Sequence, residues 1–195
     1  MNRTALRRAA FAEEALAPDA AAGRAVLLAV LLAQDGSTTR LCEAIAGGPI
    51  QVHVARQRLT RDVPGEVRRE LPGGEFIERY SSLAADGEVM MDNLTYIAVT
   101  GLDPVVRQGL EDGTVPIGHL LERLWIRRRR LPAQTLQALG RHLWEEFAPA
   151  DEAASRAYVI VTPEAPRFVI AETYRYGMLR TLPGIGAASS AEQGR

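Results

Sequence analysis

Alternation of apolar and polar residues predicts five β-strands along this chain. The segments are 50–59, 75–83, 88–99, 157–162 and 167–174. An Asp86-Gly87 pair separates the second segment from the third, and a turn at residues 163–166 separates the last two. Each of these pairs is therefore expected to form an antiparallel hairpin. The last segment is apolar at both alternating sets of positions, which predicts a central strand covered on both faces.

Helices are predicted where apolar residues are dense or follow helical spacing. The expected ranges are 23–34, 39–46, 102–110, 118–130 and 132–147. The nearly continuous apolar run of the first range is typical of a buried helix, and the polar residues 35–39 supply N-caps for the second. Residues 60–74 are charged and contain two Pro-Gly pairs, which predicts a loop.

Strands paired in hairpins, with helices between them, predict an α+β domain built on an antiparallel sheet. A Rossmann-type fold is excluded because the chain lacks both the βαβ alternation and a GxGxxG loop. Residues 1–22 are expected to form a loose or helical N-terminal arm, and residues 23–182 a single domain. Residues 183–195 are rich in Gly, Ala and Ser, which predicts a disordered tail.

Composition narrows the chemistry. The chain has 195 residues, 47% of them hydrophobic, with a net charge of −1, which argues against a general nucleic-acid binder. All 23 basic residues are arginine, so a Schiff-base or P-loop lysine is excluded and any anion must be held by arginine. A single cysteine, Cys42, excludes an intrachain disulfide and is expected to pack within its helix. The longest apolar run has nine residues, against the roughly 20 that a bilayer requires, so we expect a cytoplasmic protein without membrane association.

Two charged residues lie within otherwise apolar strands. Glu172 shares a strand face with Phe168 and Ile170, where burial disfavours a charged carboxyl group unless a cation or hydrogen-bond donor compensates it. It is either an acid–base group or a strand-end residue paired with a structural arginine. Arg79 shares a face with Ile77 and is either an edge residue or the anchor of an anionic ligand. It is also a candidate for the cation that compensates Glu172. Together they suggest a small carboxylate-bearing molecule in an enclosed pocket.

The remaining candidates are weaker. His53, His119 and His142 are widely separated and lack paired spacing, so no metal site is expected. His119 follows Pro116-Ile117-Gly118 and either lines a pocket or packs at a helix start. The arginine run 127–130 lies at the end of a predicted helix without interleaved aromatic residues, which indicates a solvated face rather than a nucleic-acid site.

Four blocks of sequence, at residues 31–41, 78–98, 116–118 and 168–172, carry a more specific signal. They include Gln-Asp-Gly-Ser-Thr-Thr-Arg, Glu-Arg-Tyr, Pro-Ile-Gly and Phe-Val-Ile-Ala-Glu. In this order and spacing they resemble the chorismate pyruvate-lyase (4-hydroxybenzoate synthase) family, and its actinobacterial branch in particular. The resemblance implies a chorismate lyase-like fold, in which helices cluster around a six-stranded antiparallel sheet and helix-loop flaps bury a ligand pocket. It also implies release of pyruvate and a hydroxybenzoate from chorismate without a cofactor, for secondary metabolism or glycolipid synthesis.

The resemblance also assigns roles to residues. Arg79 takes the place of the arginine that grips the ring carboxylate, and Glu172 that of the glutamate that meets the 4-hydroxyl end; both are candidate catalytic residues. The Pro-Ile-Gly turn offers the backbone amide of Ile117 to the ligand, and the flap after the first helix offers further backbone contacts. Further substrate-binding candidates are Ser37, Thr38 and Thr95.

Two positions depart from the family pattern. Leu94 stands where many family members have an arginine or another polar residue, and Asp92-Asn93 stands where small residues are usual. If Leu94 and Asp92 face inward, they change the charge and shape of the pocket. Two alternatives therefore stay open beside the lyase. One is a related lyase or cyclase acting on another aromatic acid, and the other is a non-catalytic small-molecule-binding domain of the UTRA type.

Overall fold

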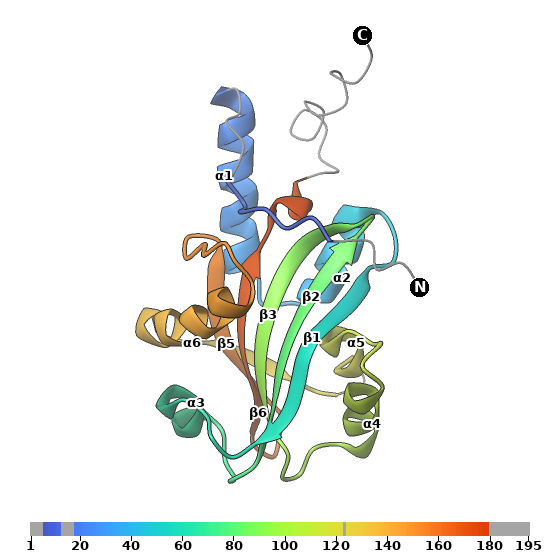
Figure 1. The fold of residues 1–195 in the computed structure, drawn as a ribbon, viewed down its shortest axis with the longest axis vertical. Helices are drawn as coiled ribbons and strands as arrows, with labels where there is room; N and C mark the ends of the chain where they lie inside the picture. Colours follow the sequence, from blue (N-terminus) through green and yellow to red (C-terminus); the bar gives the residue numbers. More distant parts are fainter. Residues whose placement is uncertain (1–5, 13–17, 123, 180–195) are drawn as a thin grey trace.

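The protein is built on a six-stranded antiparallel sheet with the strand order β1-β2-β3-β6-β5-β4 (Figure 1). The computed structural model describes residues 6–12, 18–122 and 124–179. The strands are β1 (Gln51–Thr60), β2 (Phe76–Ala85), β3 (Glu88–Ala98), β4 (Arg127–Arg130), β5 (Ser155–Val161) and β6 (Pro166–Tyr174). The predicted α+β fold with an antiparallel sheet of six strands is therefore confirmed. β6 lies between β3 and β5, as its apolar faces predicted.

The β2–β3 hairpin closes with a two-residue turn. Asp86 and Gly87 both adopt positive φ angles, 48° and 81°, which is the backbone of a type I′ turn. This turn matches the right-handed twist of the strands and pairs Ala85 with Glu88. A bulge between Leu83 and Ala84 then shifts the register, so that Arg79 pairs with Thr95 and Ser81 with Asn93. The turn and the bulge together set which residues of the two strands share a face.

Six α-helices and one 3-10 helix, η1, accompany the sheet in the described residues. They are α1 (Pro18–Ala33), α2 (Thr38–Ala46), α3 (Gly65–Glu70), α4 (Pro104–Asp112), α5 (Ile117–Leu120), α6 (Ala133–Glu146) and η1 (Tyr176–Met178). Side-chain caps start two of them. The Ser37 hydroxyl accepts a hydrogen bond from the Arg40 amide at the start of α2, and the Asp103 carboxylate accepts from the Val105 and Val106 amides at the start of α4.

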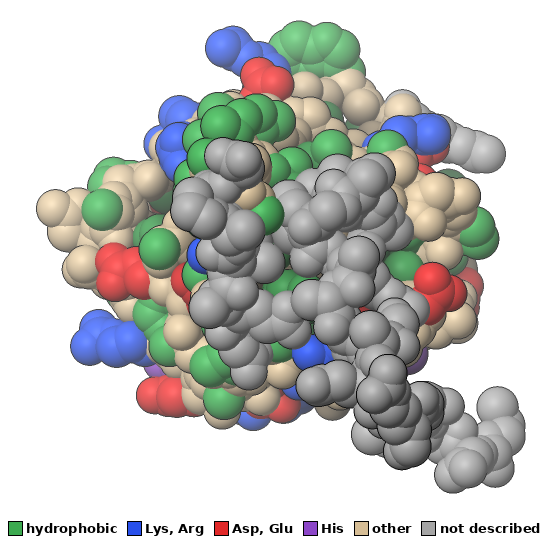
Figure 2. Space-filling view, turned by 90° about the horizontal axis from the view of Figure 1, so that it is seen from above, with side chains coloured by type: hydrophobic (Ala, Val, Ile, Leu, Met, Phe, Trp, Pro, Cys, Tyr) green, Lys and Arg blue, Asp and Glu red, His purple; other side chains and the backbone are tan. Residues whose placement is uncertain are grey.

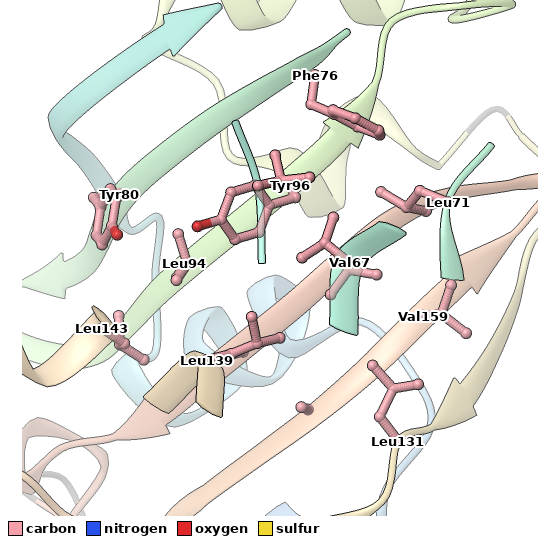
Figure 3. Packing of buried hydrophobic residues seen from close by; sticks show 14 of the residues in the cluster. Val67, Leu71, Phe76, Tyr80, Leu94, Tyr96, Leu131, Leu139, Leu143 and Val159 are labelled. Carbon is pink, nitrogen blue, oxygen red and sulfur yellow. The ribbon is translucent and has the colours of Figure 1, made fainter. Parts of the chain in front are cut away.

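Helices cover both faces of the sheet (Figure 1). On one face α6 and α3 pack on a cluster that includes Leu94, Tyr96 and Leu139 (Figure 3). On the other face α4 and α5 pack on Ile97 and Ile170, among others. Even-numbered residues at positions 92–98 of β3 therefore face α6, and the odd-numbered residues face α5.

This alternation places Leu94 and Asp92 away from Glu172 and Arg79. Leu94 is buried in the apolar cluster beneath α6. The Asp92 carboxylate accepts from Arg175 Nε at 2.6 Å and from Arg8 Nε at 3.0 Å. The condition under which these two residues would change the pocket is therefore not met, because Asn93 is the residue of this stretch that points to the other face and lines the cavity there.

Two expected elements differ from the structure. Residues 118–130 do not form one helix: α5 ends at Leu120, and the arginine run is the edge strand β4, paired with β5. Consecutive charged side chains keep such an edge from pairing with another chain, and they hide the apolar alternation of a strand. Residues 60–74 are not a simple loop, because they contain α3, whose Val67 is buried against the sheet.

The N-terminal elements also differ from expectation. α1 projects beyond the end of the sheet (Figure 1), so Val26 and Val30 are 65% and 55% exposed, and hydrophobic side chains gather at this end of the molecule in Figure 2. Residues 6–12 are neither helical nor loose: the Arg7 amide donates to the Gly87 carbonyl at 2.9 Å, and Phe11 is buried. The predicted tail, residues 183–195, lies outside the described residues. No helix that the structure describes is both long and apolar enough to cross a membrane.

The Asp92 network generates a prediction about stability. Asp92→Ala leaves Arg175 buried without its counter-charge, so we expect the free energy of unfolding to fall by about 3–5 kcal/mol. Urea denaturation measures this change. Glu111→Ala, on the exposed side of α4, is the control and should stay within about 0.5 kcal/mol of the wild type. A loss below about 1 kcal/mol in Asp92→Ala would contradict the network's structural role.

Candidate functional site

A cavity of about 40 Å³ lies between the sheet and helices α2 and α5. Its lining includes Thr38, Ser81, Asn93, Thr95, Ile117, Gly118, Tyr158, Ile170 and Glu172. A benzene-sized molecule needs about 150 Å³, so the segments above the sheet must move outward before an aromatic ligand fits. The cavity therefore marks the position of a closed site.

Glu172 lies at the centre of a buried hydrogen-bond network. Its Oε1 accepts from Arg156 Nε at 2.6 Å and from the Tyr174 hydroxyl at 3.0 Å, and its Oε2 accepts from the Tyr158 hydroxyl at 3.0 Å. The Thr38 hydroxyl adds a longer bond of 3.3 Å to Oε1. The register of β5 and β6 places Arg156 directly opposite Glu172. The hypothesis that Arg79 compensates Glu172 is therefore wrong, since Arg156 does so.

The groups around Glu172 hold their protons firmly. Burial and the nearby charge of Glu172 raise the pKa values of Tyr158 and Tyr174, so both hydroxyls stay donors at neutral pH. Burial is the largest single influence on the pKa of Arg156 and acts to lower it, but the charge of Glu172, the nearby Tyr174 and Tyr158 and the hydrogen bond to Glu172 together raise it, so the net shift is upward. The result is a carboxylate surrounded by fixed donors that a polar ligand group can join.

Arg79, in contrast to Arg156, lacks hydrogen-bond partners for part of its guanidinium group. Its side chain is fully buried, and Nη1 donates to Gln57 Oε1 at 2.9 Å and to the Leu110 carbonyl at 3.3 Å. Nε and Nη2 are buried without a hydrogen-bond partner, and no carboxylate among the described residues pairs with this guanidinium. Burial lowers the pKa of Arg79 to about 10, which is still well above neutrality. Arg79 is therefore a buried cation with two free donors.

The sheet holds Arg79 and Glu172 on the same face. Arg79 on β2 pairs with Thr95 on β3, and Asn93, two residues away on β3, pairs with Glu172 on β6. Two strand spacings of about 4.8 Å separate β2 from β6, so the two backbones lie roughly 10 Å apart across the sheet. The Thr95 hydroxyl lines the cavity and is buried without a partner. Arg79 itself adjoins the cavity through Thr95 rather than lining it.

The starts of α2 and α5 form the cover of the cavity. Thr38 and Ile117 line it, as expected, whereas Ser37 does not line it and instead caps α2. α2 and α5 approach so closely at Gly118 that an added Cβ atom would lie 2.7 Å from Thr39 Cβ and 3.0 Å from Ser37 Oγ. Only glycine fits there without displacing one of the two segments.

His119 ties the two covering segments together. Its Nε2 lies 2.8 Å from the Glu43 carboxylate on α2, and its Nδ1 lies 2.6 Å from Glu122. Burial acts to lower the pKa of His119, but the hydrogen bonds to Glu122 and Glu43 outweigh it and raise the pKa. Arg40 of α2 also pairs with Glu122 at 2.8 Å. Protonated His119 is thus a clasp between α5 and α2.

One comparison with known proteins identifies the family of this chain. The family model described as chorismate pyruvate-lyase Rv2949c-like matches residues 32–182, which include both Arg79 and Glu172. The chain belongs to this family. Membership implies a lyase acting on a small-molecule substrate. No curated protein sequence matches the chain.

Solved structures show only a distant likeness to this family member. The effector domain of PhnF from Mycobacterium smegmatis is 14% identical with a TM-score of 0.42, covering 72% of this chain and 88% of that one. Gene product SA0254 from Staphylococcus aureus is 11% identical with a TM-score of 0.40, covering 67% and 87%. A GntR-family transcriptional regulator from Enterococcus faecalis is 10% identical with a TM-score of 0.37, covering 63% and 91%.

The sequence did not reveal four residues of the site in this lyase-family chain. They are Arg128, Arg156, Tyr158 and Tyr174. Arg156 stands one position before the expected strand 157–162, so it was not counted on the face that carries Tyr158. Extending that alternation by one residue would have placed a cation beside Glu172. Arg128 was hidden in the arginine run that predicted a helix end.

The His119 clasp predicts a pH dependence of ligand binding. Because the pKa of His119 is raised in the folded state, the clasp is complete below about pH 6.5 and is lost as the pH rises through the folded pKa. We expect the dissociation constant of 4-hydroxybenzoate to increase over that interval in calorimetric titrations. His119→Gln should abolish the increase, and His142→Gln, on the exposed side of α6, should retain it. An unchanged profile in His119→Gln would show that the clasp does not hold the site closed.

Proposed function

We propose that this protein is a chorismate pyruvate-lyase that converts chorismate to 4-hydroxybenzoate and pyruvate using its own side chains. The observation that carries the proposal is the state of Arg79, a buried cation with two unpartnered donor nitrogens, Nε and Nη2. Membership in the chorismate pyruvate-lyase Rv2949c-like family supports it. Assignment to the actinobacterial branch, and a role in secondary metabolism or glycolipid synthesis, stay predictions.

The free donors of Arg79 match one chemical group. Nε and Nη2 lie on the same edge of a guanidinium, the edge that binds a carboxylate through two parallel hydrogen bonds. A buried guanidinium without a counter-charge is costly, and a ligand carboxylate removes that cost when it binds. The partnerless Thr95 hydroxyl beside Arg79 offers a further hydrogen bond. We therefore place the ring carboxylate of chorismate at Arg79 and Thr95.

Glu172 then meets the opposite end of the ring. The separation of β2 and β6, roughly 10 Å between backbones, accommodates one ring between the side chains of Arg79 and Glu172 once the segments above the sheet have moved outward. A carboxylate flanked by the Tyr158, Tyr174 and Thr38 hydroxyls accepts a hydrogen bond from the 4-hydroxyl group and lies beside C4. Orientation of the ring between two fixed charged groups supplies part of the rate enhancement.

The reaction moves one proton from C4 to the leaving group and needs no outside reactant. Glu172 takes the proton from C4, and the electron pair of that C–H bond completes the aromatic ring. The ether bond between C3 and oxygen breaks, with its electron pair leaving on oxygen. Glu172 then gives the proton to the methylene carbon of the enolpyruvate, which becomes pyruvate. Aromatisation of the ring drives the step, so Glu172 needs only to act as a positioned acid and base.

The structure weakens the case for a repurposed pocket. Leu94 and Asp92, which motivated that alternative, lie on the face beneath α6 and take no part in the cavity. The assay that tests the proposed function mixes purified protein with chorismate and measures pyruvate and the aromatic product together. Identification of the aromatic product shows whether it is 4-hydroxybenzoate, another hydroxybenzoate isomer or another aromatic acid. Release of both in equal amounts supports the lyase, and no release of pyruvate contradicts it.

Arg79→Met separates a ligand anchor from a structural residue. We expect the unfolding midpoint of the ligand-free variant to stay unchanged or rise, because a buried charge without an ion partner is removed. Affinity for 4-hydroxybenzoate should fall about 30-fold or more, corresponding to a loss of about 2–5 kcal/mol. Thermal denaturation and calorimetry measure the two effects, with exposed Arg127→Met as the control. A large loss of stability with unchanged ligand affinity would make Arg79 structural.

Glu172→Gln tests the proton transfer. Glutamine preserves the shape of the side chain and one acceptor oxygen but removes the counter-charge of buried Arg156, so we expect a lower free energy of unfolding in a folded variant that still binds 4-hydroxybenzoate. Pyruvate release from chorismate should slow about 100-fold or more, the scale of a lost acid or base. Tyr174→Phe removes one donor to Glu172 but leaves the carboxylate, and it should lower turnover less than tenfold. Equal turnover in Glu172→Gln and the wild type would remove Glu172 from the chemistry.

A further inference from the structure

Arg128 separates the cavity over the sheet from a second cavity. The second cavity has a volume of about 150 Å³ and lies where the end of α1 and residues 34–35 meet strands β4 and β5. Its lining includes Leu32, Ala33, Gln34, Asp35, Arg128, Arg130, Arg156 and Tyr158. Arg128 and Tyr158 line both cavities. The two spaces therefore share one wall, made of an arginine and a tyrosine.

Arg128 is not saturated by the protein. Its Nη1 donates to the Asp35 carbonyl at 3.1 Å, but its Nε is buried without a hydrogen-bond partner. Among the described residues, the only arginines with such buried, unpartnered nitrogens are Arg79 and Arg128. Strand alternation turns Arg128 toward the cavities, opposite Ile160 of β5, whereas Arg127 is exposed and Arg129 pairs with Glu70.

The two unsaturated arginines lie on either side of Glu172. The strand order places Arg79 on β2, Glu172 on β6 and Arg128 on β4, so Glu172 stands between them across the sheet. Chorismate carries a second carboxylate on its enolpyruvyl group, which is attached at C3, next to C4. With the ring carboxylate at Arg79 and C4 at Glu172, the enolpyruvyl group extends toward β5 and β4. Its carboxylate then reaches the region of Arg128.

We propose that Arg128 binds the enolpyruvyl carboxylate of chorismate and that the second cavity receives pyruvate after the ether bond breaks. This inference rests on the proposed lyase function. Size supports it, because a cavity of about 150 Å³ holds benzene and pyruvate has the same number of non-hydrogen atoms as benzene. Charge supports it too, because Arg128 and Arg130 line this cavity beside Arg156, which Glu172 already compensates, and the lining contains a single carboxylate, that of Asp35.

Separate places for the two products have a functional consequence. 4-Hydroxybenzoate carries only the ring carboxylate and is held by Arg79, so Arg128 contributes little to its binding. Chorismate carries both carboxylates and uses both arginines. Loss of Arg128 is therefore expected to discriminate between substrate and product, which a general structural defect would not do.

The experiment compares Arg128→Ala with Arg127→Ala, the neighbouring arginine of the same strand that faces solvent. In Arg128→Ala we expect the KM for chorismate to rise about 10- to 100-fold, the effect of one lost hydrogen bond between charged groups. The dissociation constant of 4-hydroxybenzoate should change less than twofold, and both constants should match the wild type in Arg127→Ala. If Arg128→Ala does not fold, Arg128→Gln keeps the first three side-chain carbons and a hydrogen-bond donor without the charge, and it carries the same expectation.

Two results would overturn the subsite while leaving the lyase function intact. One is an unchanged KM for chorismate in Arg128→Ala, and the other is an equal loss of affinity for chorismate and 4-hydroxybenzoate. If the wild type releases no pyruvate from chorismate, the proposed function fails and the subsite fails with it. Activity of the wild type thus distinguishes failure of the subsite from failure of the function.

Discussion

The ion pair between Arg156 and Glu172 connects the parts from which the site is made. Arg156 lies opposite Glu172 in the β5–β6 register, and its guanidinium also donates to the Leu31 and Gln34 carbonyls at the end of α1. Its Nη2 reaches the Thr38 hydroxyl at the start of α2, 3.0 Å away. One buried cation therefore joins the sheet, the end of α1 and the segment that covers the cavity. Without its charge, Glu172 would be a buried carboxylate that the fold does not tolerate.

The arginines near this ion pair differ in whether the protein supplies all their hydrogen-bond partners. Arg156 is satisfied within the protein and contributes to a rigid frame, whereas Arg79 and Arg128 keep buried N–H groups without partners. Unpaired buried donors reduce stability in the ligand-free protein, and this cost is recovered when an anionic ligand supplies the missing acceptors. The arginines of this chain without lysine therefore serve two purposes. The arginine whose hydrogen bonds are made within the protein stabilises the site, and the arginines with unpartnered donors are available to bind carboxylates.

The elements that could be predicted are those whose signal is local. Period-two alternation and the Asp86-Gly87 turn identified the hairpin that carries Arg79, and the apolar faces of β6 identified the central position of Glu172. The prediction failed where the local pattern was misleading. Strand β4 contains four arginines and no apolar residue, so only its pairing with β5 makes it a strand. α1 is apolar, which predicted a buried helix, but it extends past the sheet and exposes Val26 and Val30.

The sequence by itself determined that this is an α+β domain and that Arg79 and Glu172 are charged residues within apolar strands. Only the tertiary structure decided that Asp92 belongs to the α6 face, that Arg156 rather than Arg79 pairs with Glu172, and that Arg128 borders two cavities. The reason is that alternation along a strand is set by neighbouring residues. The partner of a buried charge is set instead by which distant strand is placed beside it, and by the register between the two.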